Sequence, residues 1–317
     1  MKLKSNVKAL SRLYKVTYLL LSLSFLFLAV TTTTAFSKDN KRKTKPSTKK
    51  RLKEMCITFN ELPVAKSFGE VDQQAITYLI LDALKKHKVK AVGFVVGDQI
   101  GDSYDILGEW LNNGNILGNM TYSNQDLNEL GIEQFINDIK AGYKALEPML
   151  SGFGQKKRYF RYPYLHYGNT VESKKQIKLY LNAQHYITVP ATIIIEDYLY
   201  NLSLEKMGKI PDTNKYYSLL NEYINHVVDE IQNSENLSMQ VLKRPCRQIL
   251  QLRANRLNAV ALDELLTTIE NMGYKFISVK KALKDKLYSQ PEAYFGTRGV
   301  SYLEMIKESN PDYLPAE

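Results

Sequence analysis

Cysteine and histidine are scarce in this chain of 317 residues. Two cysteines cannot form a disulfide scaffold, and they are too few for a cysteine-based zinc site. No Cys-x-x-Cys, His-Glu-x-x-His or Gly-x-Ser-x-Gly segment occurs. The histidines are isolated, since no two of them lie three to five residues apart: His87, His166, His185 and His226. The sequence therefore lacks the usual signatures of zinc enzymes, thiol oxidoreductases and serine hydrolases, and it predicts no cofactor.

The two cysteines, Cys56 and Cys246, leave two alternatives open. In an oxidising compartment they could form one disulfide. Their positions in the sequence do not show that the two sulfur atoms meet. A pair of buried free thiols is therefore an equally good prediction.

Acidic residues are almost absent from the first 53 positions, which carry 14 Lys and Arg against the single acid Asp39. The rest of the chain carries 29 Lys and Arg against 32 Asp and Glu. The overall charge of +10 therefore belongs to the N-terminal segment, and the remainder is slightly acidic. Because a nucleic-acid binder needs basic charge on its folded surface, we expect no nucleic-acid partner.

The N-terminal segment has the pattern of an export signal. Five basic residues precede an apolar run of fifteen residues, Val16 to Val30. This length fits a signal peptide better than a membrane span of about 20 residues. Residues 1–37 are therefore predicted to be a signal peptide or, if uncleaved, a membrane anchor. The expected location is exported: periplasmic, extracellular or membrane-anchored.

Residues 38–53 carry nine Lys and Arg and are predicted to be a basic linker. Its simplest role is a solvated tether. The alternative is attraction to an anionic membrane surface or cell-wall polymer. Residues 54–287 are predicted to form the folded body, and residues 288–317 a C-terminal tail that packs on it.

Short β-rich runs alternate with long helical patterns through the folded body. About seven such units in roughly 230 residues predict a parallel sheet with right-handed crossovers. We therefore predict an α/β fold, a distorted (β/α) barrel of about seven units, closed or nearly closed. Strands are expected at 55–59, 91–97, 115–118, 158–162, 185–189, 247–252 and 274–279, and helices at 71–87, 104–112, 132–150, 173–184, 215–232 and 258–272.

Sites in such barrels lie at the carboxyl ends of the strands. Clusters of polar and aromatic residues follow five of the apolar runs: 60–61, 120–124, 161–164, 190 onward and 253–255. We expect these five clusters to converge.

The five clusters resemble, in order, the five motifs of the polysaccharide deacetylase (NodB-homology) family of metal-dependent carbohydrate esterases. The family pattern reads TFDD, HTxSHxDL, RxPY, a segment with an Asp and a Trp, and LLLHxN. This chain reads TFNE (58–61), MTYSNQDL (120–127), RYPY (161–164), TIIIEDYLYN (192–201) and ILQLRANRLNA (249–259). The resemblance covers about residues 55–280. It implies a deacetylase-like barrel and a carbohydrate polymer of the cell envelope or extracellular space as partner.

The proton-transfer positions of the family are changed in this chain. The resemblance places the general base at Asn60, whose amide does not accept a proton at neutral pH. It places the general acid at Arg253, which does not release one. The aspartate of the fourth motif falls on Ile194, with Glu196 and Asp197 close by. Catalysis of the family type is therefore not expected.

The metal positions are changed as well. The resemblance assigns divalent-metal ligands to Glu61, Met120 and Asn124. A carboxylate can bind such an ion, but a thioether and an amide are poor partners for a zinc-like metal. Among the histidines, only His166 could face the site, and a solvated loop histidine is its simpler interpretation. No metal is therefore predicted.

An ion pair of Glu61 with Arg161 or Arg253 is expected to fill the altered site. The site is then either a structural plug or a sugar-binding cleft, since tyrosine offers sugars a stacking face and a hydroxyl. The rim segments hold Tyr122, Tyr162, Tyr164, Tyr167, Tyr198 and Tyr200, although tyrosine is also common in ordinary strand packing. The predicted ligand-binding residues are Glu61, Tyr122, Arg161, Tyr164, Asp197 and Arg253.

Three functions follow as hypotheses. The first is an exported, catalytically inactive deacetylase-like protein that binds envelope or chitin-like carbohydrate. The second is a divergent, metal-independent hydrolase of C–N or ester bonds, with Glu61 as base and Arg253 as an electrophilic clamp. The third is an envelope protein-interaction module that works through the basic linker and the C-terminal tail.

Overall fold

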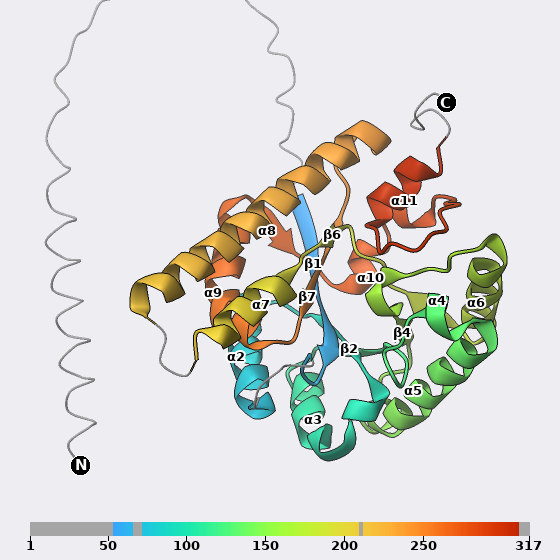
Figure 1. The fold of residues 1–317 in the computed structure, drawn as a ribbon, viewed down its shortest axis with the longest axis horizontal. Coiled ribbons are helices and arrows are strands. Elements are labelled where there is room, and N and C mark those ends of the chain that lie inside the picture. The colour runs from blue at the N-terminus through green and yellow to red at the C-terminus, as the bar shows by residue number, and fades with distance from the viewer. Residues whose placement is uncertain (1–52, 66–71, 209–211, 311–317) are drawn as a thin grey trace, which may run out of the picture. The chain divides into compact units, whose positions relative to one another are not determined.

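Eight parallel strands form one sheet in the computed structural model, which describes residues 53–65, 72–208 and 212–310. Seven strands follow the order β5-β4-β3-β2-β1-β7-β6, and β8 pairs with the first residues of β1 (Figure 1). Their bounds are β1 Lys53–Leu62, β2 Val92–Val95, β3 Ile116–Asn119, β4 Arg158–Phe160, β5 Tyr186–Thr188, β6 Ile193–Ile194, β7 Gln248–Arg253 and β8 Tyr274–Phe276.

The sheet curls into a half-barrel, because the two end strands, β5 and β6, do not pair with each other. The predicted α/β fold, a distorted (β/α) barrel, is confirmed in this open form, and full closure of the barrel is not found in the described residues. The described residues belong to one compact unit, residues 50–317. The predicted signal or anchor, almost all of the basic linker, and residues 311–317 of the tail lie outside them. No helix among the described residues is long and apolar enough to cross a bilayer.

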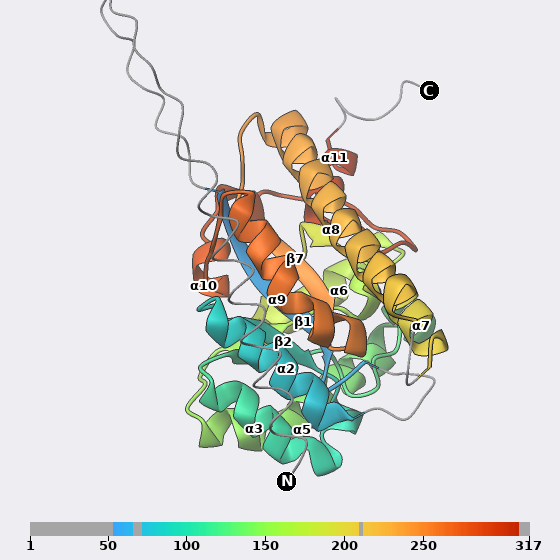
Figure 2. The same ribbon diagram turned by 90° about the vertical axis from the view of Figure 1, so that its left-hand side faces the viewer.

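Helices follow most of the strands, and α2 and α9 pack side by side on one face of the sheet (Figure 2). The α-helices are α2 Gln73–Lys86, α3 Tyr104–Asn112, α4 Leu127–Leu130, α5 Ile132–Gly152, α6 Val171–Ala183, α7 Asp197–Lys206, α8 Thr213–Leu242, α9 Arg256–Asn271, α10 Val279–Ala282 and α11 Tyr302–Glu308. Single 3₁₀ turns occupy η1 Gly97–Gln99, η2 Gly101–Ser103, η3 Pro163–Leu165 and η4 Lys286–Ser289.

Side-chain caps fix where several helices begin. The Asp72 carboxylate accepts from the Ala75 amide at 2.9 Å and starts α2. The Asn255 side chain accepts from the Asn258 amide at 2.8 Å and starts α9. Only Ala254 and Asn255 separate this helix from the end of β7. Because a cap satisfies a backbone N–H that would otherwise lack a partner, it sets the helix boundary. The Asn255 cap thereby fixes the chain reversal that follows Arg253.

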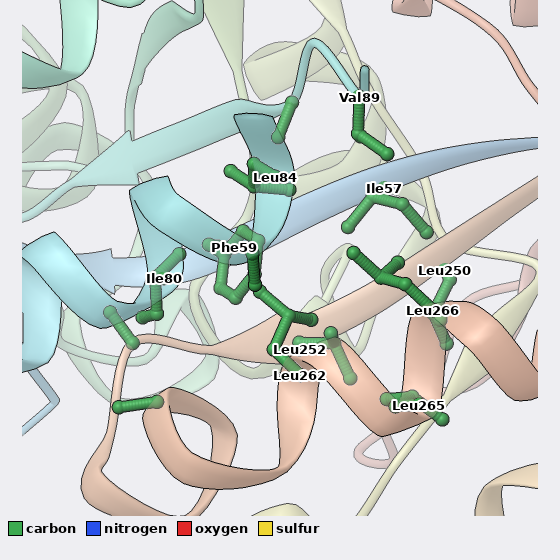
Figure 3. Packing of buried hydrophobic residues seen from close by; sticks show 14 of the residues in the cluster. Ile57, Phe59, Ile80, Leu84, Val89, Leu250, Leu252, Leu262, Leu265 and Leu266 are labelled. Atoms are coloured by element: carbon green, nitrogen blue, oxygen red, sulfur yellow. The ribbon is translucent and has the colours of Figure 1, made fainter. Parts of the chain in front are cut away.

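Alternation along β1 divides its side chains between two layers. Ile57 and Phe59 pack with residues of α2, α9 and β7 in the main core, shown in Figure 3. Cys56 lies on the other face, in a cluster inside the half-barrel. Successive side chains of a strand point to opposite faces, so Thr58 and Asn60 share the interior face with Cys56. This alternation aims Asn60 into the site described below.

The C-terminal segment closes the open side of the half-barrel. The Tyr302 amide donates to the Ala191 carbonyl at 2.7 Å, between β5 and β6. The Gly296 amide donates to the Gly168 carbonyl at 3.0 Å. Three side chains of the segment are buried in one cluster with strand β4 and helix α6: Tyr294, Val300 and Met305. Residues up to Asn310 of the predicted tail therefore complete the core.

Both cysteines are free thiols. Cys56 and Cys246 are buried in two different hydrophobic clusters. Burial raises the pKa of Cys56 to about 12 and that of Cys246 to about 11, because an apolar environment disfavours the thiolate. Of the two alternatives that the sequence left open, the structure has the pair of buried thiols.

Candidate functional site

The carboxyl ends of β1 and β7 bring two of the predicted residues together. Asn60 and Arg253 are register partners across these strands. The next residue on β1, Glu61, carries its side chain back toward Arg253. We call the surface at these strand ends, with the loops after β3, β4 and β6, the bowl. Its central side chains are Asn60, Glu61, Arg161, Asp197 and Arg253.

Arg253 is held by two carboxylates. Its Nε donates to Glu61 Oε1 at 3.0 Å, and its Nη1 donates to Asp197 Oδ1 at 2.8 Å. Burial alone would lower the pKa of Arg253, but the charges of Asp197 and Glu61 outweigh burial and raise it. The guanidinium therefore stays protonated, and it cannot act as a general acid. The sequence left Arg161 and Arg253 open as partners of Glu61, and the ion pair is made by Arg253.

Asp197 is the buried anchor of this network. Its side chain has no exposed surface, and its Oδ2 accepts from the Arg253 amide at 2.6 Å and from Asn258 Nδ2 at 2.7 Å. The Tyr223 hydroxyl donates to Asn258 Oδ1 at 2.5 Å and extends the network to α8. Asp197 is also the first residue of α7, where the helix dipole favours a negative charge. A carboxylate bound in this way positions Arg253, and the predicted contact of Asp197 with a ligand stays a prediction.

Arg161 has no carboxylate partner among the described residues, although its side chain is completely buried. Its Nη1 donates to Thr58 Oγ1 at 2.7 Å and to Asn60 Oδ1 at 2.9 Å, and its Nε donates to the Val189 carbonyl at 3.1 Å. The guanidinium lies 4.3 Å from the centre of the Phe94 ring. Burial lowers the pKa of Arg161 to about 10. Arg161 was predicted to bind a ligand, but its burial instead places it beneath the bowl as a support for Asn60.

Left-handed backbone gathers around the bowl at residues other than glycine. The φ angles are 61° at Glu61, 65° at Thr121, 56° at Asn124, 55° at Tyr164 and 57° at Leu165. Such a conformation is unfavourable for a residue with a Cβ atom, and it persists only where the surrounding structure holds it. Strained residues of this kind concentrate at binding and catalytic sites. Five of the eight non-glycine residues with left-handed backbone among the described residues therefore lie in the loops of the bowl.

The rim tyrosines separate into two groups. Tyr122, Tyr164 and Tyr198 are between 42% and 54% exposed, and the Tyr198 ring centre lies 5.1 Å from the Arg253 guanidinium. The other three pack inside the protein or against its helices: Tyr162, Tyr167 and Tyr200. Three aromatic rings are thus exposed at the rim, and the alternative of ordinary packing, which the sequence left open, applies to the other three.

The residues at the implied metal positions do not fit a metal ion. Met120 is buried in the cluster inside the half-barrel, with its side chain among apolar neighbours. Glu61 is already bound by Arg253. Asn124 Oδ1 is buried without a hydrogen-bond partner among the described residues, but a lone amide oxygen is a weak ligand. No group of three or more His, Cys, Asp or Glu suited to a metal occurs in the part of the chain that the structure describes.

A histidine–aspartate pair lies beside the bowl, and only its histidine was considered from the sequence. His166 Nδ1 lies 2.7 Å from Asp126 Oδ2, and the His166 ring is 5.8 Å from that of Tyr164. Asp126 also caps α4 through the Asn128 amide at 2.9 Å. The second motif contains Asp126, so its sequence position was a usable signal. Asn258 lies in the fifth motif and had the same signal, whereas Tyr223, in α8, lies outside all five motifs.

The sequence of this chain is similar to that of known proteins. Residues 47–181 match the polysaccharide deacetylase family. A peptidoglycan-N-acetylglucosamine deacetylase of Bacillus cereus is 32% identical over 106 residues, which are 33% of this chain and 38% of that protein. The chain therefore spans less than two fifths of this relative. An uncharacterized 30.6 kDa protein of Geobacillus stearothermophilus is 25% identical over 232 residues, 72% of this chain and 73% of that protein.

Two solved structures share the fold with a TM-score of 0.50 and 16% sequence identity. One is a mutant, with restored enzymatic activity, of a CE4 family pseudoenzyme from Bacillus anthracis, with 74% of this chain and 68% of that one covered. The other is a polysaccharide deacetylase of Bacillus cereus, with 71% and 91% covered. The resemblance to the polysaccharide deacetylases that the five motifs indicate is confirmed.

Proposed function

We propose that this polysaccharide deacetylase-like protein is exported and binds cell-envelope or chitin-like carbohydrate in its bowl without hydrolysing it. One observation carries the loss of catalysis. Arg253 joins Glu61 and Asp197 into a salt-bridged unit at the point where the family pattern has a proton donor and a metal ligand. Both carboxylates accept hydrogen bonds from the guanidinium, so neither is free to activate water.

The absence of a general base at Asn60 does not depend on the salt-bridged unit of Arg253, Glu61 and Asp197. Asn60 uses its amide oxygen to accept from Arg161, which orients the amide and blocks its acceptor. An amide at this place can neither take a proton from water nor compensate the Arg161 charge. Because base, acid and metal positions are all replaced, restoring any one of them alone does not restore a working unit.

The binding half of the proposal rests on the rim. Tyr122, Tyr164 and Tyr198 present accessible rings around the charged centre. Their faces can stack on the C–H groups of a sugar ring and their hydroxyls can bond to its oxygens. The Arg253 guanidinium, partly exposed between Tyr198 and Glu61, adds a hydrogen-bond donor. The strained loops that carry Glu61 and Tyr164 hold these groups in place without a ligand, which favours preorganised binding.

The similar proteins suggest the kind of glycan. The Bacillus cereus relative is named a peptidoglycan-N-acetylglucosamine deacetylase, and a protein of the same fold is described as a CE4 family pseudoenzyme. We extend from these names to peptidoglycan or a similar N-acetylated polymer as ligand. Export follows from the apolar run at Val16–Val30, and the basic residues 38–53 provide the proposed attraction to an anionic membrane surface.

Glycan-array binding by the full chain, with acetate release measured in parallel, tests the proposal. We expect retention on N-acetylated glycans with no acetate produced. Replacing Tyr122, Tyr164 and Tyr198 together by alanine should weaken binding by about tenfold or more, since each aromatic contact contributes about 0.5–1.5 kcal/mol. A matched control replaces three equally exposed tyrosines on other elements by alanine: Tyr78, Tyr104 and Tyr217.

Two outcomes would contradict the proposal. Equal binding by the rim variant and the control variant would remove the bowl as the ligand site. Acetate release that survives a chelator and disappears in Glu61→Gln would instead support the metal-independent hydrolase. A partner that is lost with residues 288–317 while the bowl variants still bind it would favour the interaction module.

A further inference from the structure

A second cavity lies where the C-terminal segment covers the open side of the half-barrel. Its volume is about 570 Å³, within the roughly 300–1,000 Å³ that small-molecule sites occupy. One wall comes from α6 and β5, and the opposite wall from residues 283–305. The described residues that line this cavity, which we call the seam cavity, include none of the five central side chains of the bowl. The seam cavity therefore lies apart from the centre of the bowl, although Tyr162 and Tyr167 belong to the loop after β4 that contributes to both.

Two tyrosine side chains in the wall of the seam cavity have hydroxyl groups without a hydrogen-bond partner among the described residues, and that of Tyr167 is buried. Tyr162 and Tyr167 line it and are only 5% and 6% exposed. The Tyr167 hydroxyl is buried without a partner in the described part of the chain, and no described residue bonds to that of Tyr162. Buried polar groups are nearly always hydrogen-bonded, and one left unpaired costs free energy. The buried, unpaired hydroxyl of Tyr167 in the cavity wall therefore indicates a hydrogen-bond partner that the described residues do not supply.

The positions of these hydroxyls are fixed by ring packing. The Tyr162 ring stacks on Phe135 at 6.2 Å between centres and meets Phe160 edge-on at 5.1 Å. Tyr162 and Tyr167 lie 4.9 Å apart, centre to centre. Burial raises the pKa of both phenols well above the ordinary value, so both keep their protons. The cavity thus offers two preorganised donors.

The remaining walls suit a neutral, ring-shaped ligand. Three more tyrosines and two prolines line the cavity, which gives it flat apolar surfaces: Tyr186, Tyr288, Tyr302, Pro190 and Pro291. The charge of Lys174 is compensated by an ion pair with Glu292, and the second lining cation, Lys178, is exposed to solvent. Side-chain amides of Asn182 and Gln290 add donors and acceptors. Flat apolar walls with scattered hydrogen-bonding groups are complementary to a sugar ring.

We propose that the seam cavity binds one neutral pyranose unit, with Tyr162 and Tyr167 donating hydrogen bonds to its oxygen atoms. A volume of about 570 Å³ exceeds the roughly 30 Å³ share of one water many times, so a few bound waters would leave most of it unexplained. Because the ligand contacts both α6 and the C-terminal segment, its binding also fastens that segment to the barrel. This site would give the protein a second carbohydrate contact, independent of the bowl.

Calorimetric titration of the full chain with N-acetylglucosamine, and separately with glucose, tests the site. We expect Tyr162→Phe and Tyr167→Phe each to weaken binding of the bound sugar about 3- to 10-fold, the effect of one lost neutral hydrogen bond. Neither variant should lower the urea midpoint without sugar, because the hydroxyl removed had no partner. Tyr78→Phe, at an exposed tyrosine of α2 that lines neither the bowl nor the seam cavity, is the matched control and should leave this binding unchanged.

Three results would overturn the assignment. One is the absence of binding by both sugars. Another is binding that Tyr162→Phe and Tyr167→Phe leave intact while Tyr164→Ala abolishes it, which would assign all sugar binding to the bowl. The third is a lower urea midpoint in Tyr162→Phe and Tyr167→Phe without sugar, which would show that the hydroxyls serve the fold. Failure of the bowl variants alone would contradict the proposed function and leave the seam cavity standing.

Discussion

Two arginines of the bowl, Arg253 and Arg161, have their charges compensated in opposite ways. Arg253, on the β7 side, has gained two carboxylates and lies in a network that extends to Asn258 and Tyr223. Arg161, on the β4 side, is fully buried with only neutral acceptors and one aromatic face. The first is a charge compensated by new partners. The charge of Arg161 instead faces the amide of Asn60, at the position where the family pattern has a carboxylate.

The two arginines differ in whether a countercharge compensates the buried guanidinium. A buried ion pair with satisfied hydrogen bonds can be stable, whereas a buried charge without a countercharge is costly. The raised pKa of Arg253 and the lowered pKa of Arg161 express this contrast directly. The β7 side thus compensates the charge of its arginine with carboxylates, while the β4 side surrounds its arginine with neutral acceptors.

Removing Arg253 should have the largest effect. Arg253→Ala leaves Asp197 as a fully buried carboxylate without its countercharge, and we expect a loss of about 3–5 kcal/mol in the free energy of unfolding. Urea denaturation measures it. Arg298→Ala is the control, because Arg298 pairs with Glu308 on the surface and its loss should change little. Equal effects of the two substitutions would refute the claim that Arg253 is structurally integrated.

Replacing Asn60 by an aspartate should raise the free energy of unfolding. Asn60→Asp places a carboxylate beside Arg161 Nη1, where Asn60 Oδ1 lies at 2.9 Å. We expect about 1–2 kcal/mol of stabilisation at pH 7, since a charge-assisted hydrogen bond replaces a weaker one. Asn119→Asp is the matched control. Asn119 is equally buried but donates to Ile139 and Tyr186 rather than accepting from an arginine, so the same substitution should destabilise.

The gain in Asn60→Asp should depend on pH with a definite sign. The Arg161 charge should lower the folded-state pKa of the new aspartate below the unfolded value of about 3.9. A group with a lowered folded-state pKa contributes stability above the unfolded pKa, and that contribution is lost as the pH falls through the folded-state value. Urea midpoints from pH 7 to pH 3 measure it. A gain that is unchanged at pH 3 would show that the carboxylate does not pair with Arg161.

The smallest effect is expected from Glu61→Gln. Glu61 and Arg253 are both partly exposed, and Arg253 keeps Asp197 as partner after the change. The expected loss of about 1 kcal/mol or less is that of a pair near the surface. A loss as large as that of Arg253→Ala would mean that Glu61, rather than Asp197, is the main partner of Arg253.

Periodic features of the fold could be predicted from the sequence. The apolar runs near 57, 94 and 250 are strands because they are short, rich in β-branched residues and followed by helical patterns. Motif order then located Asn60, Glu61, Arg161 and Arg253 correctly at strand ends. Short or irregular elements escaped prediction. Strand β6 has two residues, and α7 has little apolar periodicity because it begins in the network of Asp197.

Side-chain pairing was less predictable than position. The choice between Arg161 and Arg253 as partner of Glu61 depends on the left-handed conformation at Glu61, which turns that side chain toward β7. No glycine or other local signal in the sequence announces such a conformation at a glutamate. The burial of Tyr162 and Tyr167 was hidden for a related reason. Residues 294–305, far along the chain, are needed to cover them.

The zinc content of the purified full chain, after dialysis against Zn²⁺ and then against metal-free buffer, tests the central claim most directly. A bowl whose metal positions are Glu61 bound to Arg253, the buried Met120 and the lone amide of Asn124 should retain no stoichiometric zinc. One zinc ion per chain that is lost in Glu61→Gln would show that the bowl still holds a metal, and it would contradict the account.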